Sequence, residues 1–92
     1  MAIDHAKALE LAAAGQWDQA HEMVQPYSDE LSCLIHAYLH RVEGDFGNAR
    51  YWYGRAGQAM PDNTLEQELD RLHALRRDDA FRYGYQHTDL SE

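Results

Sequence analysis

The chain has 92 residues, of which 45% are hydrophobic and 26% charged, and its formal net charge is −8. A chain of this length forms one domain, which buries only about 60–65% of the surface of the unfolded chain. The acidic charge argues against binding dominated by nucleic-acid phosphates, and no apolar stretch approaches the roughly 20 residues of a membrane helix. The single cysteine, Cys33, excludes an internal disulfide bond and a cysteine-based zinc site, which favours a cytoplasmic location.

Five helices are predicted, because apolar residues recur three and four positions apart without the alternation typical of strands. The helices are expected at residues 3–14, 16–25, 28–43, 46–59 and 63–80. The breaks are marked by glycine or proline, at Gly15, Pro26, Gly44 and Pro61. The fold class is therefore all-α, with residues 1–80 forming one domain and residues 81–92 a C-terminal aromatic tail.

The apolar faces give three of these helices an expected place in the fold. Residues 3–14 carry a broad face of small side chains, which permits close approach of another helix. The helix at 28–43 is apolar on most sides and is expected at the centre. The helix at 63–80 has leucines along one side and charges on the other, as suits a lid on the end of a stack.

An internal repeat relates the first two helices to the next two. When the chain is aligned with itself at an offset of 29 residues, residues of similar type coincide. The pairs are Gly15 with Gly44, Trp17 with Phe46, Ala20 with Ala49, and Val24 with Tyr53. In each unit a glycine ends one helix, an aromatic residue begins the next, and an alanine lets the pair approach closely. Such repeats bury a continuous core only by stacking.

The second unit resembles a tetratricopeptide repeat. Over residues 30–63, the family's packing positions are filled by Ala37, Gly44, Asp45, Phe46, Ala49, Tyr53, Ala56 and Pro61. Residues 1–26 match more weakly, through Ala8, Leu11, Gly15, Trp17 and Ala20. The resemblance implies a short right-handed stack of about two helical hairpins with the fifth helix as a C-terminal cap. It rests on packing residues and says little about activity; residues 36–53 also resemble small bacterial proteins of uncharacterised activity.

Three histidines are candidate metal ligands. His36 and His40 lie four residues apart on one face of the third helix, with Glu43 a further turn along, and His21 is expected on the side of the second helix that faces them. This set of groups could ligate zinc, iron or nickel. The alternative is that His36 and His40, which replace a leucine and another large residue of the repeat, are partly buried and bond to Glu43, Asp18 or a backbone carbonyl. Residue 37 is alanine, so the motif of zinc proteases is absent.

Aromatic and arginine side chains cluster around the fourth helix. The group consists of Arg41, Phe46, Arg50, Tyr51, Trp52, Tyr53 and Arg55. Consecutive helical residues point about 100° apart, so the aromatic residues 51–53 cannot all face inward. Trp, Tyr and Arg dominate the energetics of interfaces, which favours contact with a protein or peptide. The alternative is that Trp52 packs under the fifth helix while Arg50 and Arg55 pair with acidic residues.

These patterns predict a small protein–protein interaction adaptor whose groove receives a helix or peptide of a partner. The predicted partner-binding residues are Leu34, Tyr38, Arg41, Val42, Trp52 and Arg55. Two repeats leave apolar residues exposed, so a homodimer is also expected. The alternative is a metal-binding protein or metal-dependent enzyme that uses the three histidines, with Glu43, to hold a divalent metal such as zinc. No nucleophile–base pair or phosphate-binding loop supports another enzyme class, and the adaptor needs no cofactor.

The C-terminal tail at residues 81–92 holds three aromatic side chains, Phe81, Tyr83 and Tyr85. Disordered segments normally contain few aromatic residues. The tail is therefore expected to fold back onto the stack or to contact a second subunit, and the alternative is a frayed terminus.

Overall fold

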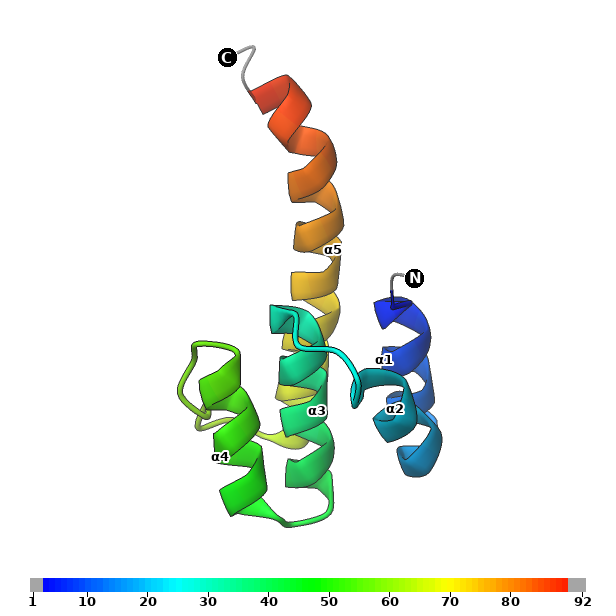
Figure 1. The fold of residues 1–92 in the computed structure, drawn as a ribbon, viewed down its shortest axis with the longest axis vertical. Coiled ribbons are helices and arrows are strands. Elements are labelled where there is room, and N and C mark those ends of the chain that lie inside the picture. The colour runs from blue at the N-terminus through cyan, green and yellow to red at the C-terminus, as the bar shows by residue number, and fades with distance from the viewer. Residues whose placement is uncertain (1–2, 90–92) are drawn as a thin grey trace.

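The computed structural model contains five α-helices within residues 3–89 (Figure 1). It describes the backbone of residues 3–89 and the side chains of residues 3–78. The helices are α1 (His5–Ala13), α2 (Trp17–Val24), α3 (Glu30–Val42), α4 (Phe46–Arg55) and α5 (Leu65–Asp89). The all-α prediction is confirmed, and none of the helices, over these described residues, combines the length and apolar character needed to cross a membrane.

Hydrogen bonds from side chains explain where four of the helices begin. The carboxylates of Asp4, Asp29 and Asp45 each accept the backbone N–H three residues further on, at 3.0, 3.1 and 3.3 Å. At the start of α5, Thr64 and Gln67 form a capping box in which each side chain accepts the other's backbone N–H at 3.0 Å. These bonds satisfy donors that the first turn of a helix leaves without an intrahelical partner.

Gly15 and Gly44 end α1 and α3 in the same way. Both residues have positive φ angles, of 78° and 84°, and in each case the residue after the glycine donates its N–H to a carbonyl in the last turn of the helix (Gln16 to Leu11 at 2.9 Å, Asp45 to His40 at 2.8 Å). This left-handed ending is the usual reason for glycine at the end of a helix. The 29-residue repeat therefore includes the backbone conformation of the two turns.

Replacing Gly44 with alanine is expected to destabilise the fold by about 1 kcal/mol, because a Cβ atom disfavours a positive φ angle. Nothing lies within 4 Å of the position that the Cβ would take, so no steric clash adds to this loss. Urea denaturation measures it, with Gly44→Asn as the control, since asparagine tolerates this conformation better. Equal midpoints for the wild type and the alanine variant would contradict the assignment.

The helix α3 lies at the centre and packs against each of the other four helices. Every residue from Leu31 to His40 is buried, which agrees with its apolar character on most sides. The neighbouring helices contribute small or aliphatic side chains and one tyrosine to the core: Ala8, Leu9, Ala20, Val24, Ala49, Tyr53 and Leu72. The alanines at the two repeat-equivalent positions, Ala20 and Ala49, are both fully buried.

The long helix α5 packs against α1 and α3 (Figure 1). It continues to Asp89, whereas the sequence pattern predicted an end at residue 80. The segment from Leu65 to Asp89 contains no proline and a single glycine, so nothing in it forces the helix to stop. The contacts expected for the aromatic tail at residues 81–92 depend on side chains that lie outside the described residues.

A buried carboxylate ties α5 to the neighbouring helices. Glu68 is fully buried and accepts hydrogen bonds from the Tyr53 hydroxyl at 2.7 Å, from the Asn63 amide at 2.9 Å, and from two nitrogens of Arg71 at 2.8 and 2.9 Å. Arg41 of α3 in turn donates to the Asn63 side chain at 2.8 Å. Burial alone raises the pKa of Glu68, but the hydrogen bonds from Arg71, Asn63 and Tyr53 outweigh burial and hold this pKa below its ordinary value.

Candidate functional site

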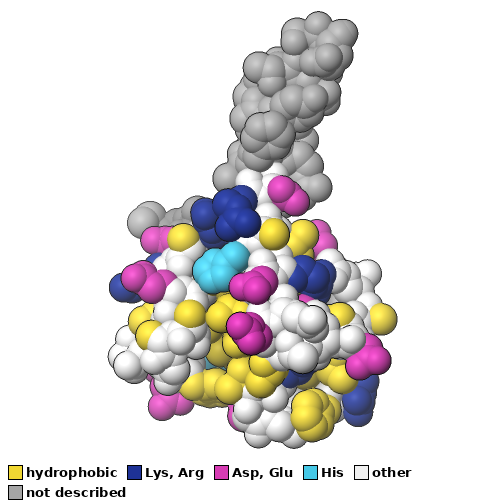
Figure 2. Space-filling view, turned by 180° about the vertical axis from the view of Figure 1, so that it is seen from behind, with side chains coloured by type: hydrophobic (Ala, Val, Ile, Leu, Met, Phe, Trp, Pro, Cys, Tyr) yellow, Lys and Arg dark blue, Asp and Glu magenta, His cyan; other side chains and the backbone are white. Residues whose placement is uncertain are grey.

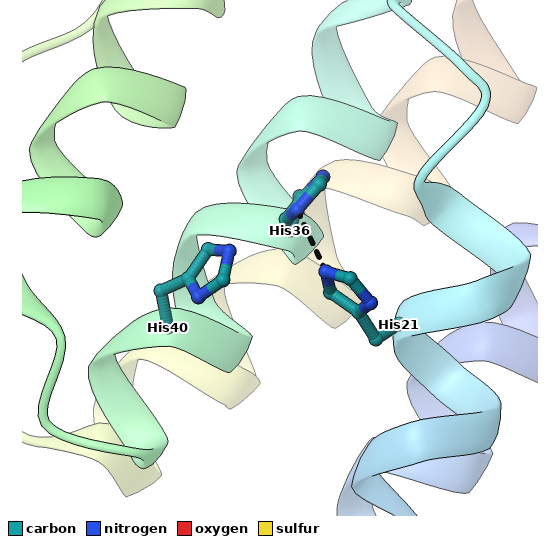
Figure 3. Close-up of side chains that lie close together, drawn as sticks. All are labelled: His21, His36 and His40. Atoms are coloured by element: carbon teal, nitrogen blue, oxygen red, sulfur yellow. Dashed lines mark hydrogen bonds between the residues drawn. The ribbon is translucent and has the colours of Figure 1, made fainter.

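The structure brings together the three histidines that the sequence singled out (Figure 3). His21 extends from α2 toward His36 and His40 on α3, and Nε2 of His21 lies 3.1 Å from Nε2 of His36. One ring nitrogen from each of the three side chains lies within 4.8 Å of the other two. We call this group the histidine cluster.

Helix geometry and the packing of α2 on α3 position the histidine cluster. The i, i+4 spacing places the rings of His36 and His40 one above the other, with ring centres 4.9 Å apart and planes inclined at 30°. His21 reaches them because the same helix buries Ala20 and Val24 completely, which fixes its orientation. His36 and His40 are only 2% and 6% exposed, whereas His21 is partly accessible to solvent.

Two tryptophans hold the imidazole rings in place. Trp17 stacks on His21, with ring centres 4.7 Å apart and planes at 11°, and Trp52 stacks on His36 at 3.9 Å and 15°. The indole N–H of Trp17 donates to the backbone carbonyl of Leu39 at 2.7 Å, which anchors this ring to α3. The i, i+4 spacing of Trp17 and His21 in the sequence places both rings on one side of α2. Trp52 thus packs against His36 of α3. The alternative given for this residue was that it packs under the fifth helix.

Two members of the histidine cluster are neutral at pH 7. Burial, followed by the nearby His21 and His40, lowers the pKa of His36 to about 4. Burial, followed by His40, also lowers the pKa of His21. Neutral imidazole is the form that binds metals. Among the described residues, Nδ1 of His36 is buried without a hydrogen-bond partner, and such a group is uncommon in a folded protein.

The acidic residues near the cluster take different positions. Glu43, predicted as a metal ligand, lies with its carboxylate 3.3 Å from Nδ1 of His40, one of the contacts that the alternative without a metal allowed. Because this bond engages Nδ1, the other ring nitrogen of His40 remains for the cluster. Glu43 thus orients a histidine from outside the three-nitrogen group. Asp18 is exposed and acts on His21 as a nearby negative charge.

Three residues of the second predicted group, Tyr51, Trp52 and Arg55, lie together on α4 and form what we call the α4 surface, whereas Tyr53 of the same group is fully buried. The Arg55 guanidinium lies 5.0 Å from the centre of the Trp52 ring and 5.8 Å from that of Tyr51. It also donates to the Tyr51 hydroxyl at 3.2 Å. Tyr51 is 54% exposed and Arg55 is exposed as well. Arg55 therefore contacts aromatic rings here, whereas the alternative paired it with acidic residues.

The four groove residues on α3 have different environments. Leu34 and Tyr38 belong to the core, with 1% and 7% exposure. Arg41 is partly buried and donates to Asn63, just before α5. Val42 is 45% exposed. Of the predicted partner-binding residues on α3, Leu34 and Tyr38 are thus buried in the core, and Val42 is exposed.

The view in Figure 2, from the side opposite to Figure 1, shows acidic and basic side chains scattered among apolar ones on the body of the molecule. Comparison of the chain with protein-family models, with curated proteins and with solved structures gave no match. The histidine cluster and the α4 surface are the two features of the described residues from which a function can be proposed.

Proposed function

We propose that this chain is a small helical interaction module that binds an acidic segment of another protein on the α4 surface. The observation that carries the proposal is the arrangement of Tyr51, Trp52 and Arg55, three residue types that dominate interface energetics. Arg55 lies over both aromatic rings, and Trp52 is braced by His36. A surface already ordered in the free protein loses little conformational entropy when a partner binds.

Charge favours an acidic partner segment. The helix α4 contains Arg50 and Arg55 and no acidic residue, whereas the chain as a whole carries a net charge of −8. A local positive region on an acidic protein attracts carboxylates and repels other positive surfaces. The partner would therefore combine carboxylate side chains with an apolar group that packs against Tyr51.

The finer fold assignment, a tetratricopeptide-like stack of two hairpins, is part of this proposal, with α5 packed across α1 and α3. It is supported by the matching glycine turns after α1 and α3, by the buried alanines Ala20 and Ala49, and by the packing of α1 on α2 and of α3 on α4. In proteins of this type the faces of the first helices commonly bind peptides. Here α5 packs against α1 and α3, which leaves α4 to meet the partner.

The chain could bind a second copy of itself in place of another protein, and exposed apolar side chains mark where such a homodimer forms. Val42 and Phe46 flank the turn between α3 and α4 and are 45% and 51% exposed. Exposed apolar side chains of this size are common at contacts between subunits. We propose that a homodimer, where it forms, uses this turn, and sedimentation analysis of the wild type and of Phe46→Glu tests it. A dimer constant that is the same for both proteins would reject this interface.

The variants Tyr51→Ala and Arg55→Glu test the proposed partner surface. Each is expected to cost about 2 kcal/mol of binding free energy, which is about a 30-fold loss of affinity. The immobilised protein captures partners from a cell lysate, and purified partners are then titrated against each variant. Arg77→Glu, the same charge change at an exposed position on α5, serves as the control and is expected to bind like the wild type. Equal affinities for Arg55→Glu and Arg77→Glu would rule out the α4 surface.

A further inference from the structure

We infer that His21, His36 and His40 form a binding site for one first-row divalent metal ion, with Zn²⁺ as the reference occupant. This site adjoins the α4 surface through the stacking of Trp52 on His36, but it does not depend on the proposed partner. Imidazole nitrogens suit zinc, copper, nickel and iron, whereas calcium and magnesium prefer oxygen ligands. The chemistry of the three ligands thus selects the class of metal.

The distances between the nitrogens suit a metal ion. Zinc–nitrogen bonds of 2.0–2.1 Å place two ligand nitrogens of a tetrahedral site about 3.3–3.4 Å apart. Nε2 of His21 and Nε2 of His36 already lie 3.1 Å apart. The third nitrogen lies within 4.8 Å of both, at most about 1.5 Å farther than the tetrahedral edge.

The surroundings of the cluster match those of known histidine–metal sites in one important respect. Metal-binding histidines commonly hydrogen-bond a carboxylate through their second nitrogen, which fixes the ring and makes it a stronger ligand. The contact between Nδ1 of His40 and Glu43, at 3.3 Å, supplies this carboxylate. The stacked rings of Trp17 and Trp52 restrict His21 and His36 in the same way. The three ligands are thus largely oriented before a metal arrives.

The charges near the cluster favour a cation. The carboxylates of Glu43, Asp18 and Glu22 all act on His21 as nearby negative charges. They offset part of the free energy needed to bring a divalent ion into a partly buried position. His21 is accessible from solvent, which gives the ion a path to the cluster and leaves a fourth coordination position for water or an outside ligand.

A purely structural role explains the cluster less well. Leucine at position 36 would bury apolar surface without leaving Nδ1 of His36 buried and unpaired, as it is here among the described residues. The 3.1 Å contact between two neutral imidazoles also requires that they share a single proton. When a metal ion binds, this proton moves to the Nδ1 atom of the ring that carried it, and both Nε2 atoms ligate the ion.

The test uses the full chain after treatment with a chelator. Calorimetric titration with Zn²⁺ is expected to give one ion per chain, and Co²⁺ is expected to give the strong visible absorption of a four-coordinate complex, which Zn²⁺ then displaces. At a free zinc concentration about 100 times Kd, the melting temperature is expected to rise by about 10 °C or more.

Single variants locate the site. Glu43→Gln is expected to weaken Zn²⁺ binding about 10–100-fold, and His21→Gln, His36→Gln or His40→Gln by more than about 100-fold. His73→Gln, at a partly buried histidine of α5, is the matched control and is expected to bind Zn²⁺ like the wild type. Because His21 is the least buried of the three, His21→Gln still gives a folded protein to test if the α3 variants unfold.

Two results would overturn the metal site. The first is the absence of stoichiometric binding of Zn²⁺, Ni²⁺ and Co²⁺ by the wild type. The second is binding with unchanged affinity in a folded triple variant that replaces all three cluster histidines with glutamine, since the metal would then be held elsewhere on the chain.

Discussion

Replacement of Glu68 with leucine is expected to destabilise the protein by about 3 kcal/mol, the lower end of the range for a broken buried ion pair, because the Arg71 side chain is partly exposed. The Glu68 carboxylate is fully buried and accepts four hydrogen bonds, two of them from Arg71. The leucine variant leaves the Arg71 charge, the Tyr53 hydroxyl and the Asn63 amide without this acceptor. Small domains have only about 5–15 kcal/mol of net stability, so this variant should lose a large part of it.

Urea denaturation followed by circular dichroism measures the effect. The double variant Glu68→Leu with Arg71→Leu is the control, because it removes both charges of the pair and is expected to recover part of the loss. Glu68→Gln keeps the shape of the side chain and should fall between the wild type and the leucine variant. A leucine variant within about 1 kcal/mol of the wild type would show that this network does not hold α5 in place.

Acidification of the metal-free protein from pH 7 to pH 4 is expected to reduce the free energy of unfolding by about 3 kcal/mol through His36 alone. In the folded state the pKa of His36 is lowered to about 4, from the ordinary value of 6.5, mainly by burial. Between these two values the unfolded chain binds a proton that the folded chain does not. Stability therefore falls as the pH drops from about 6.5 to 4, and below about 4 this contribution no longer changes.

The variant His36→Leu isolates this contribution from that of the carboxylates, which titrate in the same range. The difference in unfolding free energy between the variant and the wild type is expected to grow in favour of the variant as the pH falls from 6.5 to 4. Chemical denaturation at a series of pH values, with a chelator present, measures it. Two parallel pH profiles would mean that His36 accepts a proton in the folded state as readily as in the unfolded one.

The local features of the fold could be predicted from the sequence because short-range chemistry decides them. Apolar spacing gave the five helices, and Gly15 and Gly44 marked the two left-handed turns. The spacing of His36 and His40 also predicted their shared face. For His21, the prediction depended on which side of α2 packs on α3, and the structure confirms that it faces the other two histidines.

The long-range features could not be predicted in this way. Nothing in the leucine pattern of α5 indicates whether the helix covers the end of the stack or lies against α1 and α3, because both positions bury the same stripe. Leu34 and Tyr38, predicted to line the groove, lie in the core. Glu68 carried a signal that was not used: it lies three residues after Leu65 and four before Leu72, so a charged group was bound to fall on the apolar side of the helix.

The placement of the tryptophans has a practical consequence. The chain contains two tryptophans, and both stack on imidazole rings of the histidine cluster. Its tryptophan fluorescence, excited at wavelengths that tyrosine does not absorb, thus comes from this one location. An unlabelled sample in a fluorimeter is enough to follow protonation, ligand exchange or loosening between α2 and α3 in real time.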